Sequence, residues 1–352
     1  MNSSTKIITD GRISALKKLN RHLNLLAKDG VRKFFILTDE HTLDLCLPTL
    51  IYNAPVLENA EFLELPAGEA CKEISIVSEV WKSLAASGAD RKSIIVNLGG
   101  GCICDTGGFV AATYKRGIDF INVPTTLTAM VDAAIGGKTA INLDAVKNQV
   151  GCFKNPIITC IDPTFLVTLP DSELRSGEYE IMKILLLTGY ESWANVCFDE
   201  IDYNDLILYC INFKQSVVKA DPKEAGIRKI LNFGHTFGHA LEAYGLNHGK
   251  QISHGEAIGI GMLYALYLST KKLALGKDCL MNYKSWLTTR VDIPKPSLKE
   301  IEELLGYMHD DKKNHDSKTL CVLLKSPGVP VIDVAVSDNE IRDTFLSAAL
   351  SA

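Results

Sequence analysis

Four polar side chains recur at helical spacing in the segment RKILNFGHTFGHALEA. Arg228, Asn232, His235 and His239 follow one another at steps of four, three and four residues. Steps of this size place side chains on one stripe of a helix, which apolar residues would normally fill. Because a buried guanidinium, amide or imidazole needs a partner, the stripe indicates a buried ligand, a metal or a charged substrate.

Two further segments add metal-binding side chains. HGEAIGIGM contains His254 and Glu256, and GEYEIMK contains Glu180 and Lys183 three residues apart. One carboxylate and two imidazoles with an open position form a catalytic zinc site. HExxH is absent because no Glu follows His235 directly, and a lone His is more often a core residue. Spacing alone leaves open which two histidines would bind the metal.

A glycine loop, NLGGGCICDTGGF, follows a strand-like run and opens a helix. Such a loop can present backbone N–H groups and a positive helix end to a phosphate. It matches neither GxGxxG nor GxxxxGK[ST], so a tight turn without a ligand and a dinucleotide site are about equally compatible with it. Asp105 suits a helix cap, a ribose or a substrate hydroxyl, and Asp39, at the end of the first strand, fits a ribose contact.

A third segment, PTTLTAMVDAAIGGKTAINLDAVKNQVG, places charged and amide groups among small and apolar residues. They are Asp132, Lys138, Lys147 and Asn148. Two lysines and an asparagine in such a context are not expected to form a solvated face. The segment therefore predicts an anion pocket.

The elements that must position these groups change character along the chain. Up to about residue 170, strand-like and helix-like runs alternate, with strands expected near 33–39, 61–66, 93–101, 119–126 and 157–162. This rhythm predicts an α/β, Rossmann-like domain over residues 1–170, with a mostly parallel sheet covered by helices on both faces. Beyond it, helical periodicity dominates, and two short strands are expected near 319–325 and 329–336. We therefore expect a largely helical domain over residues 171–352.

Composition limits the class of protein. The net charge of −5 over 352 residues gives no general basic field, so we expect no nucleic-acid partner. The ten cysteines include no CxxC pair, which disfavours a zinc ribbon or thioredoxin motif and is typical of a reducing cytosol. MNSSTKIITD does not resemble a signal peptide, and no apolar run reaches the ~20 residues that span a bilayer. We expect a cytoplasmic protein without a membrane partner.

Taken together, the motifs resemble those of the 3-dehydroquinate synthases, within the sugar-phosphate cyclase superfamily. GGGCICDTGGFVAATYKRG, PTTLTAMVDAAIGGKTAIN, KNQVGCF, SGEYEIMK, NFGHTFGHALEA, SHGEAI and DDKKN occur in that family's order, over about residues 65 to 330. The resemblance implies an enzyme with an NAD-binding α/β domain and a helical domain. It also implies a bound divalent metal, zinc or cobalt. Cys104 stands where the family usually has glycine, and we expect its side chain to crowd the pyrophosphate.

The resemblance also assigns residues to roles. It implies metal ligands at Glu180, His235 and His254, and a homodimer in which Arg116 reaches the partner's site. Implied NAD contacts are Gly68, Glu69, Lys72, Gly100, Gly101, Cys102, Ile103, Cys104, Asp105, Thr125, Thr126, Lys138, Lys147, Phe165, Leu166 and Thr168, and Asp39 joins them from its place at the end of the first strand. Implied substrate contacts are Asp132, Lys138, Asn148, Lys183, Lys214, Arg228, Asn232, His239, Lys312 and Lys313.

The implied substrate is the seven-carbon keto acid phosphate DAHP, which carries a carboxylate, a phosphate and adjacent hydroxyls. Arg228 and Lys214 suit the carboxylate, and the remaining basic and amide groups suit the phosphate. Two alternatives stay open. One is a sister cyclase that makes a valiolone or a deoxy-inosose, and the other is a metal-dependent polyol dehydrogenase, which would release NADH.

Overall fold

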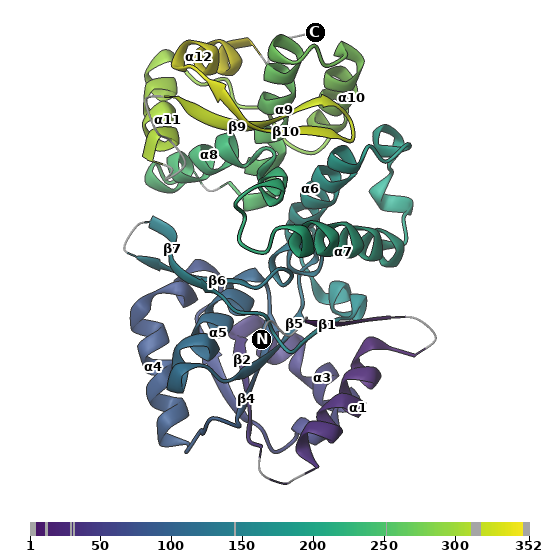
Figure 1. Cartoon of the computed structure of the whole chain (residues 1–352), viewed down its shortest axis with the longest axis vertical. Helices are drawn as coiled ribbons and strands as arrows, with labels where there is room; N and C mark the ends of the chain where they lie inside the picture. The colour runs from purple at the N-terminus through teal and green to yellow at the C-terminus, as the bar shows by residue number, and fades with distance from the viewer. Residues whose placement is uncertain are drawn as a thin grey trace. The chain divides into compact units, whose positions relative to one another are not determined.

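The chain folds into two compact units. The computed structural model describes residues 5–10, 13–28, 30, 32–143, 146–250, 252–310 and 318–347. Contacts assign Met1–Leu174 and Tyr203–Gln215 to the first unit, and Arg175–Asp202 and Ser216–Ala352 to the second (Figure 1). Residues 203–215, which we expected in the second domain, belong to the first unit because Ile207 and Leu208 line a cavity with Ile161 and Pro163.

The first unit is built on a six-stranded parallel sheet, as the β-α-β rhythm predicted. The strand order is β1-β8-β5-β4-β2-β3, and each neighbouring pair runs parallel. The strands are β1 (Lys6–Thr9), β2 (Phe34–Asp39), β3 (Glu61–Leu65), β4 (Ile94–Gly99), β5 (Asp119–Pro124) and β8 (Ile158–Ile161). Every residue of β2, β4 and β8 is buried, as expected for strands of a sheet covered on both faces.

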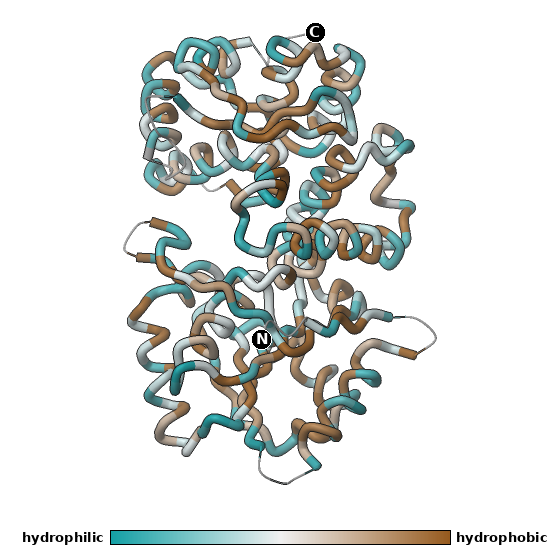
Figure 2. The backbone as a smooth tube through the Cα atoms, in the orientation of Figure 1, coloured by the Kyte–Doolittle hydropathy of each residue, from teal (hydrophilic) through white to brown (hydrophobic). Residues whose placement is uncertain are grey.

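Helices and a separate hairpin complete the first unit. The α-helices are α1 (Ala15–Ala27), α2 (Glu40–Leu45), α3 (Leu47–Asn53), α4 (Ile74–Ala86), α5 (Gly101–Thr113) and the first part of α7 (Tyr203–Ala220). The hairpin pairs β6 (Lys138–Leu143) with β7 (Val146–Phe153). The short helical turns are η1 (Pro55–Leu57), η2 (Gly68–Lys72), η3 (Tyr114–Arg116), η4 (Ala129–Ala133) and η5 (Pro163–Thr168). Figure 2 shows the apolar residues of the buried strands in brown.

The second unit is mainly helical, with one antiparallel hairpin. Its helices are most of α6 (Asp171–Thr188), the last part of α7, α8 (His235–Asn247), α9 (His254–Lys272), α10 (Lys277–Thr288), α11 (Leu298–Asp310) and α12 (Asp338–Ser347). Short turns η6 (Trp193–Asn195), η7 (Phe198–Glu200) and η8 (Ile227–Asn232) connect them, and β9 (Thr319–Ser326) pairs with β10 (Val329–Val336). Gly255 and residues 257–269 of α9 are all buried, so this helix forms the centre of the unit.

The four-residue polar stripe predicted at 228–239 is not one helix. Arg228 and Asn232 lie in the 3-10 turn η8, whereas His235 and His239 lie in α8. Gly234 separates the two with a φ of +82°, in the left-handed region that favours glycine. A Cβ at Gly234 would stand 2.6 Å from Met262 Cγ, so close packing against α9 also requires glycine here.

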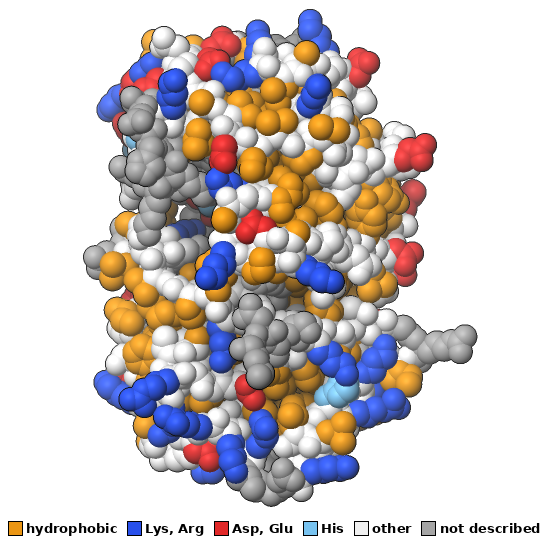
Figure 3. All heavy atoms as spheres, in the orientation of Figure 1, with side chains coloured by type: hydrophobic (Ala, Val, Ile, Leu, Met, Phe, Trp, Pro, Cys, Tyr) orange, Lys and Arg blue, Asp and Glu red, His pale blue; other side chains and the backbone are white. Residues whose placement is uncertain are grey.

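Two surface properties bear on the expected class of protein. No helix among the described residues combines the length and apolar character needed to cross a membrane. On the face that Figure 3 shows, Lys and Arg side chains are spread among apolar and uncharged groups, and acidic side chains are interspersed with them. Any anion site on this face therefore depends on local groups.

Candidate active site

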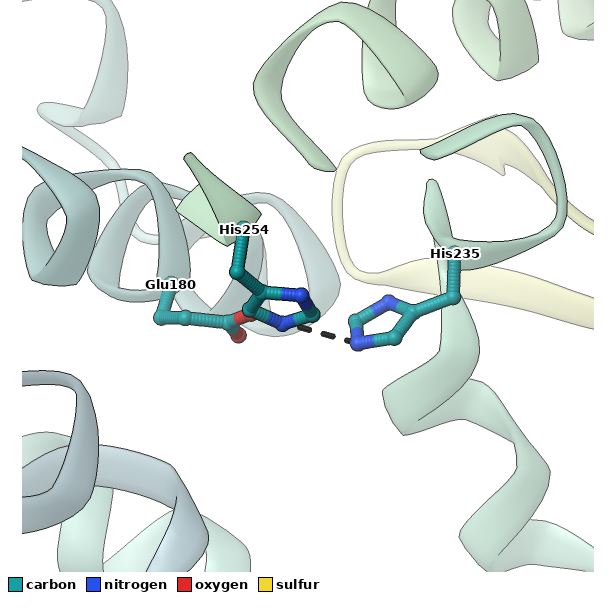
Figure 4. A group of neighbouring side chains, drawn as sticks. All are labelled: Glu180, His235 and His254. Atoms are coloured by element: carbon teal, nitrogen blue, oxygen red, sulfur yellow. Dashed lines mark ion pairs between the residues drawn. The ribbon is translucent and has the colours of Figure 1, made fainter. Parts of the chain in front are cut away.

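Three side chains expected to bind a metal meet in the second unit. Glu180 lies on α6, and His235 and His254 are the first residues of α8 and α9. His254 Nε2 lies 3.5 Å from Glu180 Oε1, and His235 Nε2 lies 3.9 Å from the same oxygen. One ligand atom from each residue lies within 4.8 Å of the others (Figure 4). Separate segments thus converge on a volume that one cation can occupy.

The histidines are oriented by contacts of their second ring nitrogen. His235 Nδ1 is 3.2 Å from the backbone oxygen of Phe233, and His254 Nδ1 is 3.1 Å from Glu242 Oε2. An N–H on each Nδ1 would donate to these oxygens, which leaves the Nε2 lone pairs facing Glu180. Metal-binding histidines characteristically have such a carbonyl or carboxylate behind them.

The charges of the site favour an added cation. Glu180 is fully buried, and neither of its oxygens accepts a well-aligned hydrogen bond from the described residues. Burial opposes ionisation of Glu180, but Lys183, whose Nζ is 2.5 Å from Oε2, and His254 outweigh it and lower the pKa to about 2. Burial likewise opposes protonation of His254, yet Glu180 and Glu242 raise its pKa to about 10. A positive charge between these carboxylates is therefore stabilised, and the residues fit a divalent metal.

A second set of ligand atoms lies beside the first. His239, Glu242 and His254 also offer atoms within 4.8 Å of one another. His239 is exposed, and Glu242 already contacts His254 through Nδ1, whereas Glu180 is buried. The buried set suits a tightly held cation better. Sequence reasoning missed Glu242, although it lies seven residues after His235, two helical turns along the same face.

Glu256, named above with His254 among the metal-binding side chains, has a structural role. Its carboxylate accepts a hydrogen bond from the backbone N–H of Ser253, and Ser253 Oγ accepts one from Glu256 N. This capping box starts α9 at His254. The backbone N–H of Gly255 also donates to Ser176 Oγ of α6, which fixes the position of the α9 N-terminus relative to Glu180.

Arg228 and Asn232 are engaged with the turn that precedes η8. Arg228 is buried, and its Nη1 donates to the backbone oxygen of Pro222 at 2.8 Å. Asn232 Nδ2 donates to Glu224 Oε1 at 2.5 Å. Lys312 and Lys313, expected beside the substrate, lie outside the described residues.

In the first unit, the glycine loop between β4 and α5 is held by a buried ion pair. Lys72 Nζ of η2 donates to Asp105 Oδ2 at 2.7 Å and to Asn148 Oδ1 at 2.8 Å. Burial lowers the pKa of Lys72, but the neighbouring Asp105 outweighs it and raises the value. Burial raises the pKa of Asp105, and Lys72 partly offsets this. The Cys104 side chain is buried, with Sγ 3.8 Å from the backbone oxygen of Gly99.

Other residues expected at the nucleotide have local roles in the chain. Asp39 caps α2, accepting hydrogen bonds from the backbone N–H groups of His41 and Thr42. Thr126 Oγ1 accepts from the backbone N–H of Ala129, and the Thr125 N–H donates to the Gly99 oxygen. Gly68 and Glu69 lie on η2, Gly100 to Ile103 begin α5, and Phe165, Leu166 and Thr168 form part of η5.

The expected anion pocket at 132–148 divides into a buried and an exposed part. Asp132 lies on η4, a π-helical turn, and pairs with Lys214 Nζ, which also donates to the Asp132 backbone oxygen. Lys138, Lys147 and Asn148 lie on the β6–β7 hairpin and are exposed. The prediction that these three are not on a solvated face is therefore wrong: among the described strands, β6 and β7 pair with each other and join no larger sheet. Arg116, on η3, is also exposed.

Comparisons with known proteins agree with this arrangement. The family models described as the N-terminal and C-terminal parts of 3-dehydroquinate synthase match residues 62–176 and 177–314. The chain is 39% identical over 319 residues to the 3-dehydroquinate synthase of Parabacteroides distasonis, covering 89% of this chain and 90% of that protein. It is 40% identical over 329 residues to that of Listeria innocua, covering 89% and 87%.

Solved structures share the fold. A 2-deoxy-scyllo-inosose synthase complexed with carbaglucose-6-phosphate, NAD+ and Co2+ matches with a TM-score of 0.80 and 25% identity, covering 97% of this chain and 96% of that one. A 2-epi-5-epi-valiolone synthase from Streptomyces hygroscopicus, with NAD+ and Zn2+ bound, matches in fold with a TM-score of 0.79 at 24% identity, covering 99% and 98%. The family models and the relatives over most of the chain show that this protein belongs to the 3-dehydroquinate synthase family.

Proposed function

We propose that the chain is a 3-dehydroquinate synthase, a carbon–oxygen lyase of the shikimate pathway that converts DAHP to 3-dehydroquinate and releases phosphate. The convergence of Glu180, His235 and His254 carries this proposal, because it supplies the metal site that the chemistry needs. Relatives of this name at about 40% identity over most of the chain support it. We also propose a cytoplasmic homodimer, with Arg116 as the residue that reaches the partner subunit.

Glu180, His235 and His254 would hold the metal, zinc or cobalt. A bound divalent ion would act as a Lewis acid and lower the pKa of a substrate hydroxyl. Lys183 lies next to this site, and its Nζ forms an ion pair with Glu180 Oε2. This pair keeps the Glu180 carboxylate ionised. Glu242 fixes the ring of His254. His239, exposed beside the ligands, can contact substrate and move a proton there.

The glycine loop and its neighbours would bind NAD. The proposed contacts are the η2 residues Gly68, Glu69 and Lys72, the start of α5, Thr125, Thr126, Lys138, Lys147 and part of η5. Bound NAD would take up a hydride and return it, so that the cofactor is unchanged overall. The buried Lys72–Asp105 pair holds η2 against α5 and so keeps the two segments in register. Phosphate elimination and an aldol closure complete the proposed reaction.

The anionic ends of the substrate call for fixed positive charge. Arg228 and Lys214 are buried cations suited to the carboxylate, and Lys214 is positioned by Asp132. Lys138, Asn148, Asn232, His239, Lys312 and Lys313 suit the phosphate. A polyol dehydrogenase would need no carboxylate site, and the proposed contacts to both anionic ends therefore favour a keto acid phosphate.

One assay separates the candidate functions. The purified protein is incubated with DAHP, NAD and zinc, and released phosphate and net NADH are measured. Phosphate without net NADH is the expected result, whereas accumulating NADH would favour a dehydrogenase. A sugar phosphate that lacks the carboxylate serves as the parallel substrate, and preference for it would indicate a sister cyclase.

Metal content tests the ligand assignment independently of turnover. His254→Ala and His235→Ala should each lose bound metal, whereas His239→Ala should retain it. Metal lost from His239→Ala and kept by His235→Ala would instead assign the ion to the second set of ligands, around Glu242.

A further inference from the structure

The hairpin β6–β7 is irregular at the point where two of the proposed binding residues lie. The pairing of β6 with β7 shifts register around Asn142. The flanking pairs are Ile141 with Val150 and Leu143 with Val146. Asn142 alone on β6 therefore stands opposite residues 147–149 of β7, which form a bulge. The bulge contains Lys147 and Asn148, proposed above to contact NAD and the substrate phosphate, and bulges commonly re-aim side chains beside active sites.

The side-chain amide of Asn142 takes the place of a ladder partner for this bulge. The backbone N–H of Asn148 donates to Asn142 Oδ1 at 2.9 Å. Asn148 has a φ of +53°, a left-handed conformation that is strained for a residue other than glycine, although asparagine adopts it more readily than most. The bond to Asn142 thus holds the backbone of the bulge in a conformation that a regular strand does not have.

The same amide joins the bulge to η2. Asn142 Nδ2 donates to Glu69 Oε2 at 2.8 Å, and Lys147 Nζ lies 3.8 Å from Glu69 Oε1. Three residues further along η2, Lys72 Nζ donates to Asn148 Oδ1 at 2.8 Å. These contacts close a circuit that runs from η2 to β6, on to β7 and back to η2.

The circuit sets the direction of the Asn148 side chain. Because its Oδ1 faces Lys72, its Nδ2 is the atom that can donate to an anion. The remainder of the hairpin is fixed in another way, since Ile141 belongs to the apolar core of the first unit and β6 packs along α5 (Figure 1). By contrast, Lys147 and Asn148 are exposed and are held by polar contacts. Loss of the Asn142 amide should therefore loosen the bulge and leave the rest of the hairpin in place.

We propose that Asn142 is a positioning residue, which holds the β7 bulge to η2 and directs Asn148 toward the substrate phosphate. The role toward the substrate rests on the proposed function, whereas the hold on the bulge does not. Because η2 is also proposed to bind NAD, Asn142 joins the cofactor segment to the phosphate segment. It acts through Asn148 and not by contact with the reacting atoms.

Hydrogen exchange followed by mass spectrometry tests the hold on the bulge. The full-length protein is used without substrate, and peptides that cover residues 146–150 are compared. Asn142→Ala removes the acceptor of the Asn148 N–H, so we expect exchange at this amide to accelerate about 2- to 10-fold. Peptides from β2 and β4 should exchange as in the unaltered chain, because the sheet is not touched. Unchanged exchange over residues 146–150 would overturn the proposal.

Release of phosphate from DAHP, at saturating NAD and zinc, tests the consequence for the substrate. Asn142→Ala should raise the KM for DAHP about tenfold, as expected for the loss of one hydrogen bond to a charged group, and should change kcat less. Asn24→Ala, at an exposed position on α1, is the matched control and should leave both constants unchanged. A KM for Asn142→Ala equal to that of the control would refute the role toward the substrate.

An exchange of amide and carboxylate isolates the contact with Glu69. Asn142→Asp places two carboxylates face to face and should raise the KM more than Asn142→Ala does. In a Glu69→Gln background the same change meets an amide that can donate, and the rise should be much smaller. An equal rise in both backgrounds would overturn the link to η2 and assign the effect to added charge near the phosphate. If the unaltered protein releases no phosphate from DAHP while Asn142→Ala still accelerates exchange in the bulge, the proposed function fails and the hold of Asn142 on β7 remains.

Discussion

His254 Nδ1 lies 3.1 Å from Glu242 Oε2, and His254 Nε2 lies 3.5 Å from Glu180 Oε1, so a carboxylate stands on either side of this imidazole. The two carboxylates differ in environment, because Glu180 is fully buried and Glu242 is partly exposed. The buried one faces the proposed metal together with His235. Glu242 fixes the imidazole ring of His254 through Nδ1, and its contribution to metal affinity can be measured separately.

Glu242→Gln should weaken metal binding without removing a ligand. The amide keeps the size of the side chain but loses the charge that orients His254, and the loss of such a contact lowers metal affinity about 10- to 100-fold. The zinc dissociation constant, measured by competition with a chelating dye, is the readout. Glu303→Gln is the matched control, because Glu303 forms a surface pair with His248 at 3.1 Å in the same unit. Equal affinities in the two variants would contradict the orienting role.

Gly234→Ala should disturb the metal site through the backbone. Residue 234 has a φ of +82°, and a Cβ there would stand 2.6 Å from Met262 Cγ and 2.9 Å from the Ile258 oxygen. Backbone strain of this type costs about 1–3 kcal/mol, and relief would displace His235, the next residue. We expect a lower free energy of unfolding, measured by urea denaturation, together with a reduced metal content. Gly276→Ala, where no atom lies within 4 Å of the added carbon, should leave the metal content unchanged.

The pairing of Glu340 with Lys272 predicts a pH dependence of stability. Lys272 Nζ donates to Glu340 Oε1 at 2.6 Å, and this bond, with the Ser337 N–H, lowers the pKa of Glu340 to about 2. A depressed pKa contributes stability above the unfolded value, near 4.5, that is lost as pH falls toward 2. Because the side chain is 39% exposed, Glu340→Gln should cost only about 0.5–1 kcal/mol at pH 7.

Denaturation curves at several pH values check this. The difference in unfolding free energy between Glu340→Gln and the unaltered chain should shrink from pH 5 to pH 2. Glu79→Gln provides the comparison, since Glu79 pairs with Lys82 while both side chains remain mostly exposed. A difference that stays constant down to pH 2 would show that the ion pair does not stabilise α12.

The pattern of the sequence predicted the sheet well because its signal is local. Runs such as FFILTD and IIVNLG are mainly apolar, and such strands are buried on both faces. The hairpin β6–β7 gave no such signal, since its segments KTAINL and VKNQVGCF mix apolar with polar residues and most of its residues are exposed. Composition alone therefore suggested enclosure where the chain has a surface hairpin.

The sequence predicted which residues belong to the metal site better than it predicted how they are arranged. Glu180, His235 and His254 meet as the resemblance implied, but periodicity placed Arg228 and Asn232 on one helix with the histidines. That reading failed at Gly234, where packing against α9 imposes a left-handed residue that helical spacing does not reveal. The role of Glu242 depends on where α9 begins, which is a tertiary relationship.

Lys72→Met should destabilise the first unit and weaken NAD binding. The variant leaves Asp105 without its counter-charge, and the side chains of the pair are only 4% and 19% exposed. Removing one partner of a buried pair costs about 3–5 kcal/mol. Lys72→Met combined with Asp105→Asn removes both charges, and we expect it to recover part of the lost unfolding free energy.

The way in which the stability of Lys72→Met depends on pH shows whether lost charge or lost packing destabilises this variant. Burial raises the pKa of Asp105, and loss of Lys72 removes the main opposing influence. A carboxyl whose folded pKa exceeds its unfolded value favours folding at low pH, and it loses that contribution as pH rises through the folded value. The defect of Lys72→Met, measured by urea denaturation relative to the unaltered chain, should therefore be smaller at pH 5 than at pH 8. In the double variant with Asp105→Asn, the loss of unfolding free energy should not vary with pH. If Lys72→Met alone loses the same unfolding free energy at pH 5 and at pH 8, the loss comes from the missing packing of the lysine stem and not from the unpaired Asp105 carboxylate.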